Sequence, residues 1–231
     1  MTQSLASPAD FDEQEPDPSV SVLQLAVTVD AADMPAAAVA AGTEALSTAL
    51  RDPDIRVIVL GLQPRPAAPP PGPQPQPDDL HDWLLALWES DKPTVAALQG
   101  PLGGAGLALA LACDLLVAGQ EVRMHLPPRL QAAGRSAAAT WLASRRLPGA
   151  AASALALGCE LDAARAHALG LVLELTPAGM ALERAVEIAR GIAAETADVL
   201  RDVRMRLAGG PAQGLSQALA DDRARWLRAR A

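Results

Sequence analysis

The sequence predicts an α/β protein with a mainly parallel sheet, and three observations support this fold class. Short apolar runs with the composition of strands alternate with Ala- and Leu-rich segments at helical spacing. Such alternation favours right-handed β-α-β crossovers, which build parallel sheets. The chain has 231 residues, enough for one domain with a large core, and only 2% of them are aromatic. A core of Ala, Leu and Val therefore has to form by close approach of helices and strands.

Five segments are predicted to be strands. Residues 20–29 are rich in Val and Leu, and residues 55–60 read Ile-Arg-Val-Ile-Val-Leu before Gly61 closes the segment. The other three strands are expected at 94–98, 114–118 and 171–175. A glycine-rich turn is expected at 100–106, between the third strand and the helix that follows it.

Helices are predicted between the strands and after them. The first, 34–51, ends at Asp52-Pro53, and Asp78 or Asp79 can cap a second helix that runs to residue 89. Asp162 can cap a helix over 163–169, which Gly170 ends. The remaining helices are expected at 107–112, 136–147, 150–157, 178–194, 198–207 and 215–230.

Two proline-containing stretches predict segments without helix or strand, and the overall charge argues against one class of partner. Residues 1–19 are acidic and contain prolines, which predicts a disordered lead, and the proline-rich segment 63–77 predicts an extended loop. The net charge of −8 argues against a nucleic-acid partner. The start of the chain has no apolar signal region, and the apolar stretch 102–119 is interrupted by glycines and an aspartate. We therefore expect a cytoplasmic protein without a membrane segment.

The two cysteines, Cys113 and Cys159, lie in apolar stretches at a spacing that suits no metal site. We expect both to be buried and reduced, which fits a reducing compartment, and we expect no metal.

The glycine turn is the main candidate for a functional feature. Gly103, Gly104, Ala105 and Gly106 lie between a strand and a helix, where glycines allow close approach and the first N–H groups of the helix remain unpaired. Such a turn can hold a phosphate or an oxyanion, although tight packing of a strand on a helix explains the glycines equally well. The turn is neither a P-loop nor a G-x-G-x-x-G motif, which argues against a dinucleotide oxidoreductase.

Three stretches of the chain match one family pattern in the right order. Residues 92–100 read K-P-T-V-A-A-L-Q-G, and residues 101–118 continue through the glycine turn and a small-residue helix to C-D-L-L-V-A. Residues 154–172 give a second match, and residues 54–61 give a weaker third one. Together these stretches resemble the enoyl-CoA hydratase/isomerase (crotonase) superfamily over about residues 20–200.

The resemblance implies an α/β fold with a crotonase-like ββα spiral core over 20–195 and a helical C-terminal part, used in trimerisation, over 196–231. It implies trimers or paired trimers, binding of coenzyme A thioesters, and a place in fatty acid metabolism. Coenzyme A would arrive as part of the substrate, and no other cofactor is implied. In the family two backbone N–H groups hold the thioester oxygen, and member-specific side chains transfer protons or act as nucleophiles.

The family pattern also implies what this chain lacks. Laid on residues 100–128 without gaps, it places the second oxyanion donor on the N–H of Ala105, beside Gly104. The two hydratase glutamates fall on Ala108 and Pro128, and neither can carry a proton. Hydration needs one group to activate water and one to deliver a proton, so ordinary hydratase activity is expected to be absent or very slow.

The first oxyanion donor is expected in the proline-rich loop. It falls on Pro70, which has no N–H, and a small shift would move it to Ala67, Ala68 or Gly72. Of these positions, Ala67 and Ala68, together with Gly103, are expected to contact the substrate.

Several other side chains are candidates for chemistry. His81 and Ser136 lie where some dehalogenase-like relatives carry functional residues, but His81 can equally be a surface residue and Ser136 a helix cap. His125 and Arg129 can border the acyl channel or lie on the surface, and His167 is expected to serve a helix C-terminus. Four C-terminal arginines can touch coenzyme A phosphates or form a solvated helix face: Arg223, Arg225, Arg228 and Arg230.

Two functions therefore stay open. The chain is either a crotonase-type lyase, isomerase or hydrolase acting on an acyl-CoA, or a catalytically silent binding or assembly protein that kept the scaffold. An enzyme needs a titratable group near the thioester, whereas a silent scaffold needs only apolar walls or a filled pocket.

Overall fold

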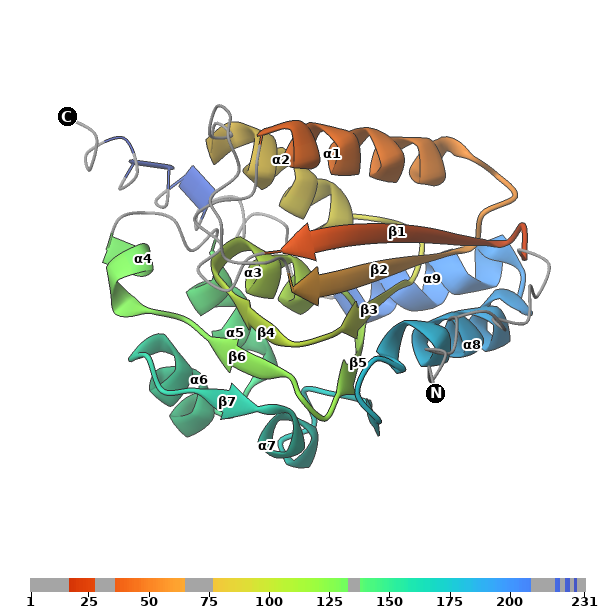
Figure 1. The fold of residues 1–231 in the computed structure, drawn as a ribbon. Coiled ribbons are helices and arrows are strands. Elements are labelled where there is room, and N and C mark those ends of the chain that lie inside the picture. The colour runs from red at the N-terminus through yellow and green to blue at the C-terminus, as the bar shows by residue number, and fades with distance from the viewer. Residues whose placement is uncertain are drawn as a thin grey trace, which may run out of the picture.

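The main sheet contains five strands that overlap the five predicted ones with shifted ends, all parallel to their neighbours. A computed structural model describes residues 17–27, 36–64, 77–132, 138–208, 219–220, 223–224 and 227 (Figure 1). The strands are β1 (Val20–Val27), β2 (Val57–Pro64), β3 (Thr94–Leu98), β5 (Leu115–Gly119) and β8 (Glu174–Thr176). They lie in the order β1-β2-β3-β5-β8, and the mixed α/β architecture confirms the predicted fold class.

A second, smaller sheet was not predicted. It consists of β4 (Pro101–Gly103), β6 (Arg123–His125) and β7 (Leu161–Asp162), in the order β4-β6-β7. The prediction of a turn throughout 100–106 is therefore wrong, because 101–103 pair with β6 and the next helix begins at Gly104. Three-residue strands are too short to show a period of two in the sequence.

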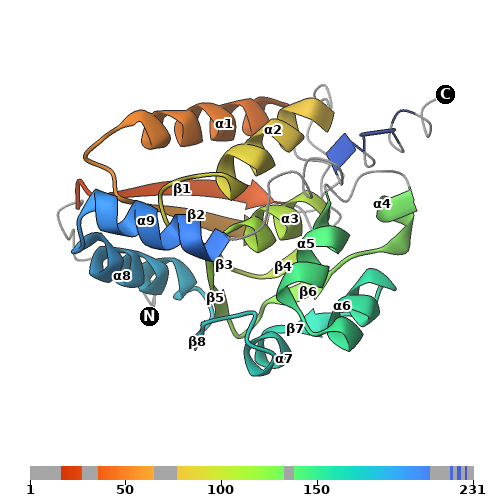
Figure 2. The same ribbon diagram turned by 180° about the vertical axis from the view of Figure 1, so that it is seen from behind.

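Helices cover both faces of the main sheet, because alternate strand residues point to opposite faces. Ile58 and Leu60 join the larger core cluster with helices α1 (Ala36–Arg51) and α2 (Pro77–Trp88). Val57 and Val59 pack on the other face, where α8 (Ala181–Ala193) presents small residues at a spacing of four: Ala181, Ala185, Ala189 and Ala193. Figures 1 and 2 show α1 and α2 on one side of the sheet and α8 on the other.

Of the remaining helices, α4 (Pro128–Ala132) was not predicted, and the others follow the predicted order with shifted ends. These others are α3 (Gly104–Ala112), α5 (Ala139–Arg146), α6 (Gly149–Ala156), α7 (Ala163–Ala168) and α9 (Ala197–Ala208). The predicted cap of α7 is confirmed, since the Asp162 carboxylate accepts a hydrogen bond from the N–H of Arg165 at 2.7 Å. Gly170 follows the helix with φ +77°, as expected for a glycine that ends it.

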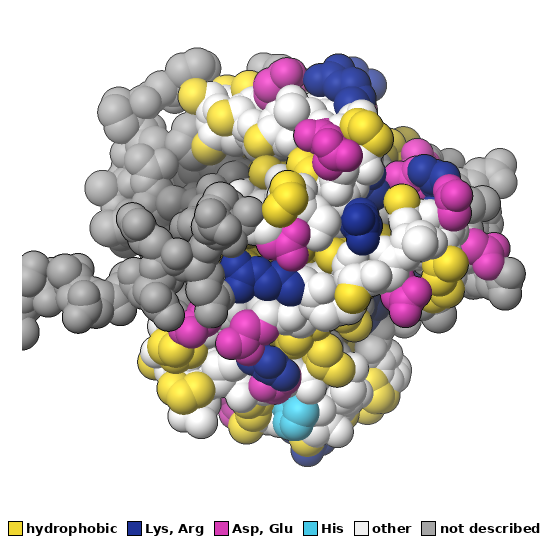
Figure 3. Space-filling view, turned by 90° about the vertical axis from the view of Figure 1, so that its right-hand side faces the viewer, with side chains coloured by type: hydrophobic (Ala, Val, Ile, Leu, Met, Phe, Trp, Pro, Cys, Tyr) yellow, Lys and Arg dark blue, Asp and Glu magenta, His cyan; other side chains and the backbone are white. Residues whose placement is uncertain are grey.

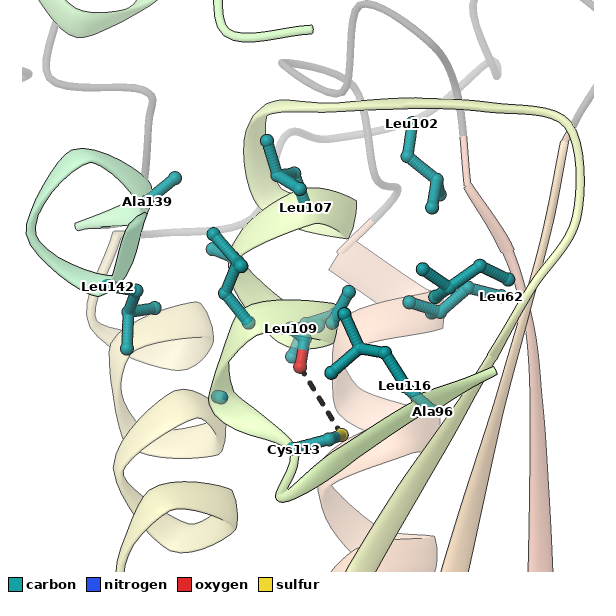
Figure 4. Close-up of a cluster of buried hydrophobic side chains, with 14 of the residues drawn as sticks. Leu62, Ala96, Leu102, Leu107, Leu109, Cys113, Leu116, Ala139 and Leu142 are labelled. Atoms are coloured by element: carbon teal, nitrogen blue, oxygen red, sulfur yellow. Dashed lines mark hydrogen bonds between the residues drawn. The ribbon is translucent and has the colours of Figure 1, made fainter. Parts of the chain in front are cut away.

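Helix α3 is the centre of the larger core, and all nine of its residues are buried. Figure 4 shows Leu107 and Leu109 of α3 with Leu142 of α5 and Leu116 of β5 around the helix. A helix that is apolar all round is expected at such a central place.

The two cysteines differ in exposure. Cys113 is buried and its Sγ lies 3.4 Å from the carbonyl oxygen of Leu109, as expected of a buried thiol (Figure 4). Cys159 is exposed, so the prediction that both cysteines are buried is wrong for it. It follows the end of α6 in a loop where Leu157 is 76% exposed, whereas Leu155 and Leu161 on either side are buried, so only part of this apolar stretch belongs to the core.

Helix lengths and surface charge indicate whether the described part of the chain suits a membrane or a strongly charged molecule as a partner. Within the described ranges, no helix has the length and apolarity that crossing a bilayer requires. Figure 3 shows one face of the molecule, on which acidic and basic side chains are interspersed and hydrophobic ones are scattered. This face therefore has no broad region of a single charge.

The predicted helix at 215–230 falls mostly outside the described residues. Leu219 is buried and belongs to the larger core cluster. Arg223 lies close to α2, since its Nε is 2.7 Å from the Asp78 carboxylate. The division of the chain at residues 19 and 195 stays a prediction.

Candidate functional site

Strand β4 leads directly into α3 and positions the start of that helix. Gly103 is the N-cap, with extended backbone at φ −147° and ψ 176°. Gly104 follows with φ +44°, in the left-handed region that favours glycine because it has no Cβ. The chain thereby turns from a strand into a helix within two residues.

The N–H of Ala105 is a buried donor at this turn. Ala105 is 2% exposed, and the second residue of a helix has no acceptor within its own helix. Over the described ranges, no backbone carbonyl outside α3 accepts from it. Buried backbone N–H groups nearly always have a partner in the native state, so this donor is suited to a ligand oxygen or a water. The positive end of the helix dipole favours an oxygen with negative charge there.

The two positions where we expect the family pattern to place its glutamates are apolar in the structure as well. Ala108 lies one turn after Ala105 on the same side of α3, and it is 0% exposed. Pro128 is the first residue of α4 and is exposed. Neither a methyl group nor a pyrrolidine ring can move a proton, so these two positions supply no acid or base.

His81 is not a surface residue, and that interpretation is therefore wrong. It lies on α2 with 7% exposure and takes part in an interaction, so its imidazole is held within the structure. Ser136, Ala67, Ala68 and Pro70 lie outside the described residues. A pairing of His81 with Ser136 therefore stays a prediction.

Sheet register brings His125 to the start of α3. In the parallel pair of β4 and β6, His125 is the partner of Gly103, the N-cap of the helix. Adjacent strands lie roughly 4.8 Å apart, so the backbone of His125 is close to the site. The sequence offered His125 only as a possible neighbour of the acyl channel, because β6 itself was not predicted. Arg129 is exposed on α4 and has an interaction partner of its own.

Glu121 lies close to the joint between the two sheets. Its Oε1 accepts from the N–H of Gly100 at 3.4 Å, and its Oε2 is buried without a hydrogen-bond partner. A Cβ added at Gly119 would lie 2.3 Å from that Oε2, so a larger residue there would displace the carboxylate. Glu121 therefore touches the segment that leads into β4, and its contacts do not place it at Ala108.

Two further sequence candidates have structural contacts. The Nδ1 of His167 lies 3.0 Å from the carbonyl oxygen of Val172, just beyond α7. Arg223 pairs with Asp78, whereas Arg225, Arg228 and Arg230 lie outside the described residues. The described residues contain no group of three or more His, Cys, Asp or Glu side chains that could hold a metal ion.

The structure shows an α/β protein with a buried N–H donor at the start of α3, and comparison with known proteins gives the family. The family model described as enoyl-CoA hydratase/isomerase matches residues 74–224, more than half of the chain. The chain belongs to the enoyl-CoA hydratase/isomerase (crotonase) family.

Individual relatives agree with this assignment. A putative enoyl-CoA hydratase of Thermus thermophilus is 38% identical over 125 residues, which are 54% of this chain and 49% of the relative. The 2,3-dehydroadipyl-CoA hydratase of Escherichia coli is 32% identical over 149 residues, 62% of this chain and 58% of the relative. The chain thus spans about half the length of these curated relatives.

A solved structure of a probable enoyl-CoA hydratase from Mycobacterium thermoresistibile has the same fold. It aligns with a TM-score of 0.74 at 18% identity, over 92% of this chain and 95% of that one. The prediction of a crotonase-like fold is confirmed.

Proposed function

We propose that this protein binds an acyl-CoA thioester, with the carbonyl oxygen held by the N–H of Ala105, and that it is not an ordinary enoyl-CoA hydratase. The observation that carries the proposal is that buried N–H, which has no acceptor outside its helix among the described residues. Family membership supports a thioester as the ligand. The two relatives compared are named as hydratases that act on coenzyme A esters.

Polarisation of the thioester needs only backbone groups. A carbonyl oxygen in front of Ala105 would receive one hydrogen bond and the field of the first turn of α3. In enzymes that stabilise oxyanions, loss of one such donor lowers kcat about 100- to 1000-fold. We place the other donor of the pair, the first in the family pattern, in the loop at 67–72, with Ala67, Ala68 and Gly103 next to the substrate.

Proton transfer is the step for which this chain lacks the usual groups. Ala108 and Pro128 stand where two glutamates would activate water and protonate the product. If the protein is a lyase or isomerase, His125 is the best candidate for the missing acid or base, because it pairs with Gly103. If it is a silent binding or assembly protein, no side chain has to replace the glutamates.

Calorimetric titration with acetyl-CoA and crotonyl-CoA tests the binding proposal. Ala105→Pro removes the N–H at a position where the first turn of a helix tolerates proline, and Ala105→Gly keeps it. We expect the glycine variant to bind like the wild type and the proline variant to bind about three- to tenfold more weakly. Thermal melts check that both variants fold. Absence of binding by the wild type, or equal binding by the two variants, contradicts the proposal.

A hydration assay with crotonyl-CoA tests the loss of hydratase chemistry. We expect no turnover above background, and a rate near that of an ordinary hydratase would refute this. If the protein instead shows isomerase or lyase turnover of an acyl-CoA, His125→Ala should abolish it and His167→Ala should not. Equal activity of the two variants would remove His125 from the proposal.

The silent alternative can be tested by stability alone. Ala108 and Ala110 are both 0% exposed in α3. If a substrate cavity faces Ala108, Ala108→Glu should be much better tolerated than Ala110→Glu, which buries a charge in the core. Equal and severe destabilisation would mean that the space at Ala108 is filled, which favours an assembly protein.

We propose assembly as a homotrimer or a dimer of trimers in the cytoplasm, with residues 196–231 at the interface. The support is an apolar stripe on α9, where Val199 and Val203 are 47% and 48% exposed. Light scattering should give a trimer or hexamer for the wild type and a smaller species for Val199→Asp/Val203→Asp. A monomeric wild type contradicts the proposal.

A further inference from the structure

A cavity of about 370 Å³ opens at the carboxyl end of α3, away from the proposed thioester site. Residues of α2, α3, α5 and α9 contribute to it, together with the loop after α3. Residues 105 and 113 lie roughly 12 Å apart along the helix axis at about 1.5 Å per residue. The cavity therefore stands apart from the N–H of Ala105. Its walls include Trp88, Asp114, Leu115, Arg145, Arg146 and Arg204.

The cavity carries an excess of positive charge. Among the described residues, three guanidinium groups line it and Asp114 is the one carboxylate on its walls. That carboxylate already accepts from Arg204 Nε at 2.9 Å and from the N–H and hydroxyl of Thr94 at 2.8 and 2.9 Å. The positive charges of Arg145 and Arg146 are thus left without a carboxylate partner on the described wall, although the protein has a net charge of −8.

The three arginines differ in how many donors they have left. Arg204 donates to the carbonyls of Ser90, Leu87 and Trp88 besides Asp114, so it is nearly saturated. Arg146 donates through both Nη atoms to the carbonyls of residues 111, 113 and 114. Its Nε has no acceptor in the described part of the chain.

Among the described residues, Arg145 forms no ion pair and its guanidinium donates no hydrogen bond. It stacks on the ring of Trp141, with 5.6 Å from its Cζ to the ring centroid. Stacking on an aromatic ring fixes the position of a guanidinium and leaves its N–H edge open. Arg145 and the Nε side of Arg146, its neighbour in the chain, therefore offer donors to an oxyanion.

The remaining wall is apolar and partly aromatic. Trp88 faces the cavity beside Leu115 and Ala112, and it is held edge-on against Trp141 with ring centroids 5.7 Å apart. A cavity of this size lies within the range of small-molecule sites, about 300–1000 Å³. The combination of an apolar aromatic wall with cationic donors suits an amphiphilic ligand rather than a bare inorganic ion.

We propose that this cavity binds a small organic anion, with a carboxylate or phosphate group at Arg145 and Arg146 and a flat apolar body against Trp88. The site is independent of the acyl-CoA proposal and uses none of its residues. Since charge-assisted hydrogen bonds are the strong ones, the oxyanion group should supply most of the affinity.

Titration calorimetry with benzoate, phenyl phosphate and neutral benzamide tests this site. We expect saturable binding of at least one of the two anions and none of benzamide, which has the same ring without the charge. Arg145→Met should weaken the binding about tenfold or more, because it removes a charge-assisted contact. The matched control Arg165→Met removes an exposed arginine from α7 and should leave the affinity unchanged.

Several results would overturn the proposal. These are no saturable binding of either anion, binding of benzamide as tight as that of benzoate, or equal loss of affinity in Arg145→Met and Arg165→Met. Competition by acetyl-CoA would also overturn it, because one shared site would then explain both ligands. Comparison of benzoate with phenyl phosphate decides between carboxylate and phosphate as the group that is bound.

Discussion

Arg204 is the residue whose removal best tests how α9 is attached to the rest of the molecule. Arg204 is 5% exposed, and its guanidinium donates to three carbonyls at the carboxyl end of α2 and just beyond it, two of them at 3.2 Å. It also forms an ion pair with Asp114 at 2.9 Å. Replacement by methionine keeps most of the apolar stem and removes every one of these donors.

The size of the effect follows from what would be left unpaired. Removing one partner of a buried ion pair typically costs about 3–5 kcal/mol. The Asp114 side chain is 32% exposed and keeps its hydrogen bonds from Thr94, so solvent lowers the cost. We expect Arg204→Met to lower the free energy of unfolding by roughly 2–4 kcal/mol, which is about 5–15 °C in Tm for a chain of this length.

Scanning calorimetry and urea unfolding of Arg204→Met measure the loss. The matched control is Arg201→Met, one turn earlier on α9, where the side chain is 47% exposed and pairs with Asp91 and Asp198. Exposed pairs of this kind contribute little, so the control should melt close to the wild type. Equal Tm values for the two variants would refute the assignment of Arg204 as the anchor of α9.

Two further predictions concern packing and thiol chemistry. Gly42→Ala should lower the free energy of unfolding by about 1–3 kcal/mol, because the added Cβ would lie 2.5 Å from ring atoms of the fully buried Trp83. Gly191→Ala is the control: its Cβ would meet open space, so it should raise the free energy of unfolding slightly. Chemical denaturation of both variants shows whether the two changes have opposite signs. Burial raises the pKa of the Cys113 thiol to about 12. A thiol reagent at pH 8 should therefore modify only the exposed Cys159 in the folded protein. Rapid modification of both thiols would contradict this. Because folding raises that pKa from 9.0, the contribution of the protonated thiol to the free energy of unfolding should be complete below pH 9 and should decline as the pH rises towards 12. The variant Cys113→Ala should not show this decline.

The main sheet was predictable because its strands are buried on both faces. Residues 57–60 and 94–98 are continuous runs of apolar and β-branched residues, and every residue of β3 is buried. Local signals such as the Asp162 cap and Gly170 also had enough chemical specificity to be recognised.

The second sheet and the arginine network were not predictable for physical reasons. Strands of two or three residues carry no period, so the register that places His125 beside Gly103 could not be expected from the sequence. The pairing of Arg204 with Asp114 joins positions 90 residues apart and leaves no local pattern. The exposure of Cys159 shows that an apolar stretch of sequence can also lie in a loop.

The proposed site at α3 has a backbone part, which would hold the thioester oxygen, and a side-chain part, which would transfer protons. A backbone N–H remains whichever side chain the residue carries, with the exception of proline, so Ala105 keeps the donor that a glycine would supply. Acid–base chemistry resides in side chains, and single substitutions at Ala108 and Pro128 are enough to remove it. In the proposed function, thioester binding is therefore the more robust half of the site, and proton transfer is the half that sequence change removes first. A search for activity should begin with reactions that need the polarised carbonyl and at most one proton-transfer group, because we propose the Ala105 N–H for the first and His125 for the second.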